Sequence, residues 1–292
     1  MTQNQHNKAC DSDLSVLRCD IDNIDDQIIS LLKARMEVVK KVGELKEKSK
    51  ESFFIRSNRE ADMIKNLVQK SQGILPKATI VGIWRKIITA ANMLEQPLKM
   101  AIHNPKNVAD YEYLVRDYYD NSVPIQNLDS VNNVVLSLEK NEAQIGIFAL
   151  PEYDLSLKEE GSNENWWIAL ANNRDGLKIF AKIPFIESRN SKTKLVAVAK
   201  KNPEKSSDDN SLFCVETSSA VDANKLIAVF EEQNLKAKVL KSVRLHKVEG
   251  VNFYLIEAAG FWLEEDEAVK NLSKTSIKPY VKVIGHYAKE IF

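Results

Sequence analysis

This chain of 292 residues is poor in the residues that build disulfide frameworks, metal sites and membrane spans. Its three cysteines, Cys10, Cys19 and Cys214, are too few and too scattered for a disulfide framework or a zinc site. Its four histidines have no metal-ligand spacing. No apolar run approaches the ~20 residues that cross a bilayer, and the first residues lack the apolar core of a signal peptide. We therefore expect a cytoplasmic protein with neither metal nor cofactor.

An excess of charge of either sign is also missing, because 41 basic and 41 acidic side chains balance. A chain without excess positive charge has no bulk attraction to nucleic acid or to an anionic membrane surface, so we expect neither as a partner. Hydrophobic residues make up 44% and charged residues 28% of the chain, as in soluble globular proteins. The length allows two or three domains.

The first third of the chain has the patterns of helices. Residues 1–12 are polar and predict a disordered lead. Apolar residues then recur at helical spacing from 13 to 50. A second helix is expected from an N-cap at Asn58, and a third from Pro76 to about Glu95. The sequence thus predicts a small domain of three helices.

Beyond Pro97, short apolar runs typical of strands alternate with helical patterns. After a polar loop at 200–211, the tail has the order β-α-β-β-α-β, which is the ferredoxin-like plan. The predicted fold class is therefore multidomain, α followed by α/β. The expected domains are a helical domain at 13–97, a small α/β domain at 98–199 and a ferredoxin-like domain at 210–292.

Two basic residues interrupt the apolar stripe of the first predicted helix. At about 100° per residue, the apolar side chains fall within roughly 80° of one line, with Arg35 at its centre and Lys46 within about 20° of it. An unpaired buried charge is costly, so each cation needs an anionic partner. No carboxylate on this stripe offers one, and the pattern therefore indicates a bound anion.

The spacing of the basic residues also bears on assembly. Arg35 and Lys46 are about 16 Å apart along the helix axis, close enough to lean towards one small ligand. Arg18 lies about 25 Å from Arg35 and is rotated by about 100°, so it can serve an equivalent site only across a two-fold dimer with antiparallel long helices. Such a dimer would also bury the apolar stripe.

Three more charged residues stand at informative places. Glu95 lies in the apolar stripe of the third predicted helix. Arg59 and Glu60 open the second helix, where the backbone N–H groups and the helix dipole favour an anion beside Arg59. Each residue also has an ordinary reading, as a solvated side chain, a common helix start or a side chain that turns outward near a helix end. The ordered set is more specific than any of its members.

Three runs carry a resemblance to a known family: LSVLRCDIDNIDDQIISLLKARMEVVKKVGELK, RSNRE and IWRKIITAANMLE. Through them residues 14–95 resemble the all-helical AroQ-type chorismate mutases. The resemblance implies an intertwined homodimer and an isomerase that converts chorismate to prephenate in phenylalanine and tyrosine biosynthesis. It implies that Arg35, Arg59 and Arg18 of the partner subunit bind the two carboxylates of chorismate.

The same resemblance assigns the remaining positions. Lys46 and Glu95 would face the ether oxygen, and Glu60 would bind the ring hydroxyl. Ala91 stands where the family commonly has Ser, which removes one expected hydrogen bond to the substrate. The reaction is an intramolecular rearrangement that needs a compact dicarboxylate and positive charge at the breaking C–O bond, and no nucleophile. An ionised Glu95 would repel the ether oxygen, so Glu95 should act in its protonated form.

The part of the chain after Pro97 resembles, with fewer motifs, the prephenate dehydratase and ACT regions of bifunctional P-proteins. The run SRNSKTKLVAVAK places Thr193 at the threonine of the dehydratase motif, whereas KMAIHNPKNVAD and LPEYD replace two other motifs. We therefore expect a degenerate dehydratase, in which loss of Thr193 leaves mutase turnover intact. This arrangement, with its Trp-Trp pair, resembles alphaproteobacterial chorismate mutases, and we interpret Trp166 and Trp167 as core or interdomain packing.

Three hypotheses stay open from the sequence. The first is a chorismate mutase. The second is a bifunctional mutase–dehydratase with diverged motifs, and the third is a non-catalytic dimer that senses an aromatic amino acid through its ACT-like domain. A helix that only dimerises has no reason to keep both Arg35 and Lys46 in its apolar stripe, which favours the first.

Overall fold

The computed structural model describes residues 4–48, 53–71, 73, 75–104, 110–151, 154–160, 165–187, 192–245 and 248–291, with the backbone alone for 4–12 and 154–160. The chain divides into two compact units. The first is Met1–Glu51 with Leu94–Gln96, and the second is Ser52–Met93 with Pro97–Phe292.

The first unit is dominated by α1 (Asn4–Lys48), a helix of 45 residues. It begins inside the region 1–12 that the sequence predicts as a disordered lead. Neither proline nor glycine occurs between Asn4 and Val42, so no residue stops the helix from continuing to Asn4. Large apolar side chains of the predicted stripe are exposed: Leu14, Leu17, Ile21, Ile24, Ile28, Leu31, Val38, Val42 and Leu45.

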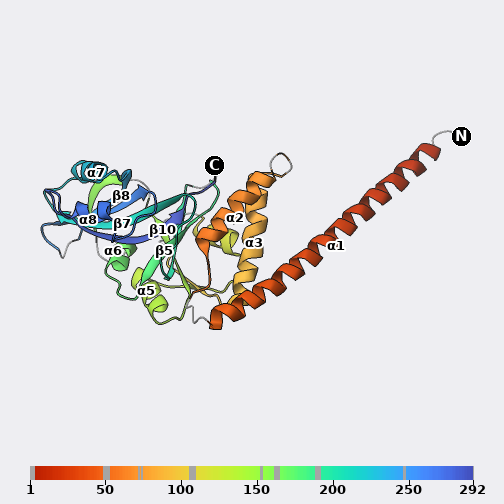
Figure 1. Cartoon of the computed structure of the whole chain (residues 1–292), viewed down its shortest axis with the longest axis horizontal. Helices are drawn as coiled ribbons and strands as arrows, with labels where there is room; N and C mark the ends of the chain where they lie inside the picture. Colours follow the sequence, from red (N-terminus) through yellow and green to blue (C-terminus); the bar gives the residue numbers. More distant parts are fainter. Residues whose placement is uncertain are drawn as a thin grey trace. The chain divides into compact units, whose positions relative to one another are not determined.

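The helices α2 (Ser57–Lys70) and α3 (Lys77–Glu95) lie side by side (Figure 1). The predicted span of α3 is confirmed, but the predicted N-cap of α2 is wrong. Helix α2 begins at Ser57, after Arg56, and no side chain caps it. The Asn58 amide instead donates to the carbonyl oxygen of Lys205 at 2.9 Å, because this partner from a distant loop competes with the local backbone.

The rest of the second unit is built on one ten-stranded mixed sheet of order β2-β1-β3-β6-β5-β10-β7-β9-β8-β4. Its strands are β1 (Met100–Ile102), β2 (Ile125–Asn127), β3 (Ile145–Leu150), β4 (Asp154–Glu160), β5 (Leu177–Ile183), β6 (Lys194–Lys200), β7 (Asp209–Ser218), β8 (Ala237–Leu245), β9 (Val251–Ala259) and β10 (Tyr280–Ala288). Its helices are α4 (Tyr111–Tyr119), α5 (Val131–Glu139), α6 (Trp166–Ala171), α7 (Ala223–Glu232) and α8 (Glu267–Leu272).

The last part of the chain has the predicted β-α-β-β-α-β element order, with α7 and α8 as its helices. Its strands lie in the order β10-β7-β9-β8, and all neighbours are antiparallel. The sequence predicts two separate domains at 98–199 and 210–292, but their strands lie in this one sheet. Strand β4, from the region 98–199, pairs in parallel with β8 at the far edge.

The two parts of the sheet meet where β10 runs parallel to β5, with Gly285 opposite Ile179. Gly285 has a φ of +146°, and a Cβ atom placed on it would lie 2.3 Å from the backbone nitrogen of Ile179. Only glycine allows the two backbones to approach this closely.

The tryptophan pair is part of the core, as interpreted from the sequence. Trp166 and Trp167 are buried and belong to the cluster between the sheet and helices α5 and α6. Trp166 donates from its indole nitrogen to the carbonyl oxygen of Ala149 at 2.8 Å and stacks on Phe148. A polar edge of the indole is satisfied while the ring adds apolar area to the core.

Candidate active site

In the first unit, Lys46 and Glu95 form an ion pair. The Lys46 Nζ atom lies 2.6 Å from Glu95 Oε2, and the two side chains are 16% and 9% exposed. The apolar stripe that contains Lys46 carries no carboxylate, and the sequence therefore suggested that Lys46 lacks a protein partner. That inference was wrong. The partner comes from the end of α3, 49 residues away in the chain.

Gly43 explains how Glu95 comes so near the helix. It is buried in α1, and a Cβ atom at this position would lie 3.4 Å from the Glu95 Cα atom. A glycine in the middle of a helix costs about 1 kcal/mol relative to alanine. Here it allows the backbone of Glu95 to pack closely against α1, one turn from Lys46.

Arg35 differs from Lys46 because part of its charge has no protein partner. Its side chain is half-buried, and its Nη1 atom is buried without a hydrogen bond to any residue that the structure describes. A buried donor left unsatisfied costs roughly 1–3 kcal/mol. This is the kind of donor that an anion would complete. Arg18, in contrast, is exposed on α1.

In the second unit, Glu60 is the centre of a polar cluster between α2 and α3. Its two carboxylate oxygens accept hydrogen bonds from Asn92 Nδ2 at 3.1 Å and from Arg85 Nη1 at 3.2 Å. Of the other predicted residues that these helices contribute to the second unit, Arg59 is exposed, and Ala91 is buried, 4% exposed, with no side-chain hydroxyl to offer.

Arg85 was missed from the sequence, although the test applied to Arg35 would have found it. It lies four residues after Val81 and three before Ile88, on the apolar stripe of α3. The residue is 4% exposed, and its guanidinium lies over the rings of Tyr118 and Phe185, 4.3 and 4.9 Å from their centroids.

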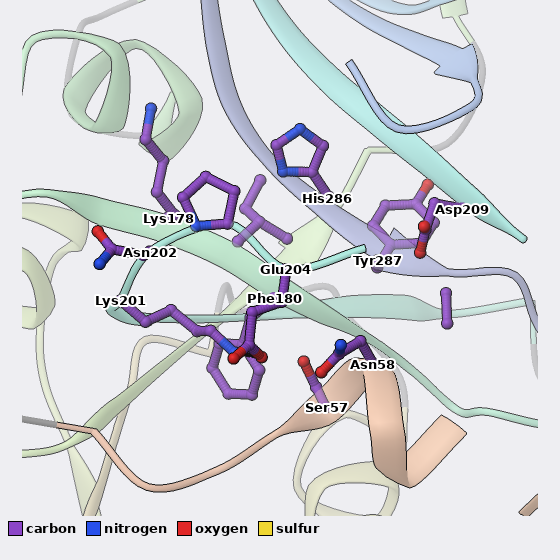
Figure 2. Close-up of a pocket in the computed structure, with 13 residues that line it drawn as sticks. Ser57, Asn58, Lys178, Phe180, Lys201, Asn202, Glu204, Asp209, His286 and Tyr287 are labelled. Atoms are coloured by element: carbon purple, nitrogen blue, oxygen red, sulfur yellow. Dashed lines mark hydrogen bonds and ion pairs between the residues drawn. The ribbon is translucent and has the colours of Figure 1, made fainter. Parts of the chain in front are cut away.

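A small pocket lies where the start of α2 meets the segment 201–204 (Figure 2). Lys201 Nζ contacts Glu204 Oε2 at 3.0 Å and donates to the carbonyl oxygen of Ile55 at 3.2 Å. Burial lowers the pKa of Lys201, against the opposing effect of Glu204. Burial alone would raise the pKa of Glu204, but Lys201 and Arg56 hold it below its usual range. Lys201 and Glu204 are thus paired with each other in this pocket.

His286 lines the same pocket. Its Nε2 atom lies 2.5 Å from the carbonyl oxygen of Trp262, and its ring stacks on Phe261. Burial lowers the pKa of His286, although the contact with Trp262 opposes this. None of the residues predicted as candidate site residues lines this pocket.

The cations and carboxylates of the helical segment have parallels in a known family. Residues 17–96 match the family model of chorismate mutase type II. The resemblance expected from the three sequence runs is confirmed for this segment, which we call the mutase segment. It contains every residue that we predicted for the site.

Similarity to individual proteins extends beyond the mutase segment. The chain is 27% identical over 139 residues to the bifunctional chorismate mutase/prephenate dehydratase of Aquifex aeolicus (strain VF5), a match that covers 46% of this chain and 38% of that protein. The matched residues thus span well under half of the relative's length.

Two solved structures are similar at low identity. One is GqqA, described as a novel type of quorum quenching acylase, with a TM-score of 0.49, 13% identity and coverage of 65% of this chain and 95% of that one. The other is prephenate dehydratase from Streptococcus mutans, with a TM-score of 0.44, 16% identity and coverage of 66% and 100%.

Neither a metal site nor a membrane-spanning helix is found in the described part of the chain. Among these residues, no three His, Cys, Asp or Glu side chains gather in a way that could hold a metal ion. No helix among them has the length and apolar character needed to cross a membrane.

Proposed function

We propose that this protein is a chorismate mutase, which isomerises chorismate to prephenate by an intramolecular Claisen rearrangement. The observation that carries the proposal is the Lys46–Glu95 pair within the mutase segment, 2.6 Å apart and largely shielded from water. These are the two positions that the family resemblance assigns to the ether oxygen of chorismate. A cation in such a shielded place interacts far more strongly with developing negative charge than it would in water.

The arginines supply the other requirement, a substrate held in a compact conformer. Arg35 has a buried donor without a hydrogen bond to any described residue, and a carboxylate of chorismate would complete it. We propose that Arg59 and Arg18 of the partner subunit bind the remaining carboxylate oxygens. Holding the reacting ends together in this way lowers the barrier by removing conformational freedom before the reaction.

Glu95 acts on the ether oxygen as a hydrogen-bond donor in this proposal, and therefore in its protonated form. Without substrate, Glu95 Oε2 contacts Lys46 Nζ at 2.6 Å. We infer that chorismate separates the two side chains, so that Lys46 directs its charge to the ether oxygen.

Replacing Lys46 tests the proposal directly. We expect Lys46→Met to lower kcat for chorismate by about 10²- to 10³-fold, as removal of one donor to a developing oxyanion does. The matched control is Lys40→Met on the same helix, where an exposed lysine pairs only with the exposed Glu37. Chorismate consumption and prephenate formation are followed together. A wild-type protein without turnover, or a Lys46→Met variant as active as the Lys40→Met control, would refute the proposal.

We also propose that the partner is a second copy of this chain, with the two α1 helices antiparallel. The exposed stripe of α1 supports this, because such a row of large apolar side chains needs a cover. The charges on α1 also complement each other in that orientation. From Asp13 to Ser30 the helix carries Asp13, Asp20, Asp22, Asp25 and Asp26 against Arg18. From Leu31 it carries Lys33, Arg35, Lys40, Lys41, Lys46 and Lys48 against Glu37, Glu44 and Glu47.

For the second half we propose a degenerate dehydratase-like region at 98–199 and an ACT-like domain at 210–292. The strand order β10-β7-β9-β8 supports the latter. An aromatic amino acid is the proposed effector. Titration of mutase activity with phenylalanine distinguishes an effector site, which changes turnover, from a scaffold, which does not.

A further inference from the structure

We propose that Arg85 is a positioning residue for Glu60, and that Tyr118 and Phe185 from outside the mutase segment hold Arg85 in place. The inference rests on the proposed mutase function and extends it. It assigns part of the mutase site to the second half of the chain, without requiring that half to catalyse a reaction of its own.

The first step is the geometry of Glu60. Its side chain is 13% exposed, and both carboxylate oxygens are engaged from α3, by Asn92 at 3.1 Å and by Arg85 at 3.2 Å. Two contacts at different oxygens fix the rotation of the carboxylate plane as well as its position. The remaining lone pairs then point in defined directions, as a hydrogen bond to the ring hydroxyl of the substrate requires.

The second step is that burying an arginine at position 85 costs free energy. Its side chain is 5% exposed, and its Nε atom is buried without a hydrogen bond to any described residue. Replacing a buried ion pair by apolar residues of similar volume is often neutral or stabilising. Packing alone therefore does not explain an arginine here, whereas a requirement to orient Glu60 does.

The third step links Arg85 to the α/β region. Tyr118 in α4 and Phe185 after β5 are 7% and 4% exposed, and both rings lie within 5 Å of the guanidinium carbon, at 4.3 and 4.9 Å from ring centroid to Cζ. A planar guanidinium stacks on such rings, and an ammonium does not do so in the same way. The position of Arg85 is thus set by residues at 118 and 185, beyond residue 96, where the mutase segment ends.

The charges of the pair also act on this ring. Burial raises the pKa of Tyr118 to about 12, while Arg85 lowers it and Glu60 raises it. Both members of the ion pair are therefore close enough to influence the Tyr118 hydroxyl. Glu60, Arg85 and Tyr118 form one connected buried cluster that joins α2, α3 and α4.

A double-mutant cycle on kcat/KM for chorismate tests the inference in the full-length protein. We expect Arg85→Lys and Tyr118→Leu each to lower kcat/KM by about 10- to 100-fold when Glu60 is present, as small misplacements of a site residue do. In a Glu60→Gln background the same changes should alter kcat/KM within about twofold, because the residue through which they act is already altered.

Two further variants make the result specific. Tyr118→Phe keeps the ring below Arg85 and should retain activity, unlike Tyr118→Leu. Arg116→Lys, two residues earlier on α4, changes an exposed arginine paired with Glu112 at 2.8 Å and should leave kcat/KM unchanged. Thermal unfolding of each variant shows that it is folded at the assay temperature.

The outcomes separate this inference from the proposed function. If wild-type protein does not convert chorismate, the proposed function fails and this inference fails with it. If wild-type protein is active but the Arg85→Lys and Glu60→Gln effects multiply, Arg85 has only a structural role and the inference alone is overturned. The same holds if Tyr118→Leu is as active as Tyr118→Phe.

Discussion

Three buried or half-buried cations of the helical segment show three ways of placing a charge away from water. Lys46 has a carboxylate partner at 2.6 Å, and Arg85 has a carboxylate at 3.2 Å and two aromatic rings. Arg35 and Arg85 each keep one buried donor without a hydrogen bond to any described residue, Nη1 and Nε respectively, but the carboxylate partner of Arg85 has no counterpart at Arg35 among the described residues. Arg35 therefore best indicates where a substrate anion binds.

Glu95 gives a prediction about the ether oxygen at the same scale. Glu95→Gln keeps a hydrogen-bond donor at this position and removes the carboxylate, so we expect it to convert chorismate at least as fast as the wild type. Glu95→Ala removes the donor and should lower kcat by about 10²- to 10³-fold. The measurement is kcat for chorismate of the three proteins at one pH.

The control for this prediction is Glu44→Ala, which changes an exposed carboxylate on α1 one residue after Gly43. Its kcat should match that of the wild type. A Glu95→Ala variant as active as Glu44→Ala would show that Glu95 does not act on the ether oxygen.

At the scale of elements, the sheet depends on the pairing of β5 with β10 and on the loop after β6. Strands β5 and β10 are paired at Gly285 and Ile179, where the backbones approach closely. The segment after β6 ties α2 to the sheet, since the Ser207 hydroxyl donates to Asp62 at 2.5 Å and Asn58 donates to Lys205. The pairing of β5 with β10 uses backbone atoms, whereas the loop contacts also depend on the side chains of Asp62, Ser207 and Asn58.

Gly285→Ala should therefore destabilise the protein. The substituted residue would combine a φ of +146° with a Cβ atom 2.3 Å from the nitrogen of Ile179. We expect a loss of roughly 2–4 kcal/mol in the free energy of unfolding, from backbone strain and steric overlap together. Thermal and denaturant unfolding measure it.

Gly82→Ala is the matched control for that substitution. Gly82 lies within α3, and a Cβ atom there would meet no other atom within 4 Å. Alanine at this exposed helical position should raise the stability by about 0.5–1 kcal/mol. Equal effects of the two substitutions would mean that the close approach at Gly285 does not hold the sheet together.

At the scale of the whole molecule, the exposed stripe of α1 predicts that activity depends on assembly. Ile28, near the centre of this stripe, is 48% exposed, so Ile28→Asp should affect the folding of a single chain little. In the proposed dimer it would bury an unpaired carboxylate. We expect a monomer with greatly reduced turnover, since Arg18 of the partner subunit is then missing from the site.

Light scattering after size-exclusion chromatography gives the mass, and chorismate turnover gives the activity. Ser30→Asp is the control, because it adds the same charge about 160° away from Ile28 around the helix. It should leave both measurements unchanged. An Ile28→Asp variant that stays dimeric, or an active monomer, contradicts the prediction.

Features that depend on neighbours in the chain follow from the sequence alone. The start of α3 after Pro76, the element order of residues 209–288 and the charges in the apolar stripe of α1 all follow from patterns within a few residues. The elements β2, β4 and α6 were not predicted.

Only the tertiary structure decided which groups meet. Glu95 is 49 residues from Lys46, Asn58 is 147 residues from Lys205, and Arg85 contacts rings at 118 and 185. Helical periodicity tells on which face a residue lies, but the partner on that face comes from another element whose position depends on the packing of the whole unit. The sequence therefore revealed which charges needed partners, and the fold determined which of them received one.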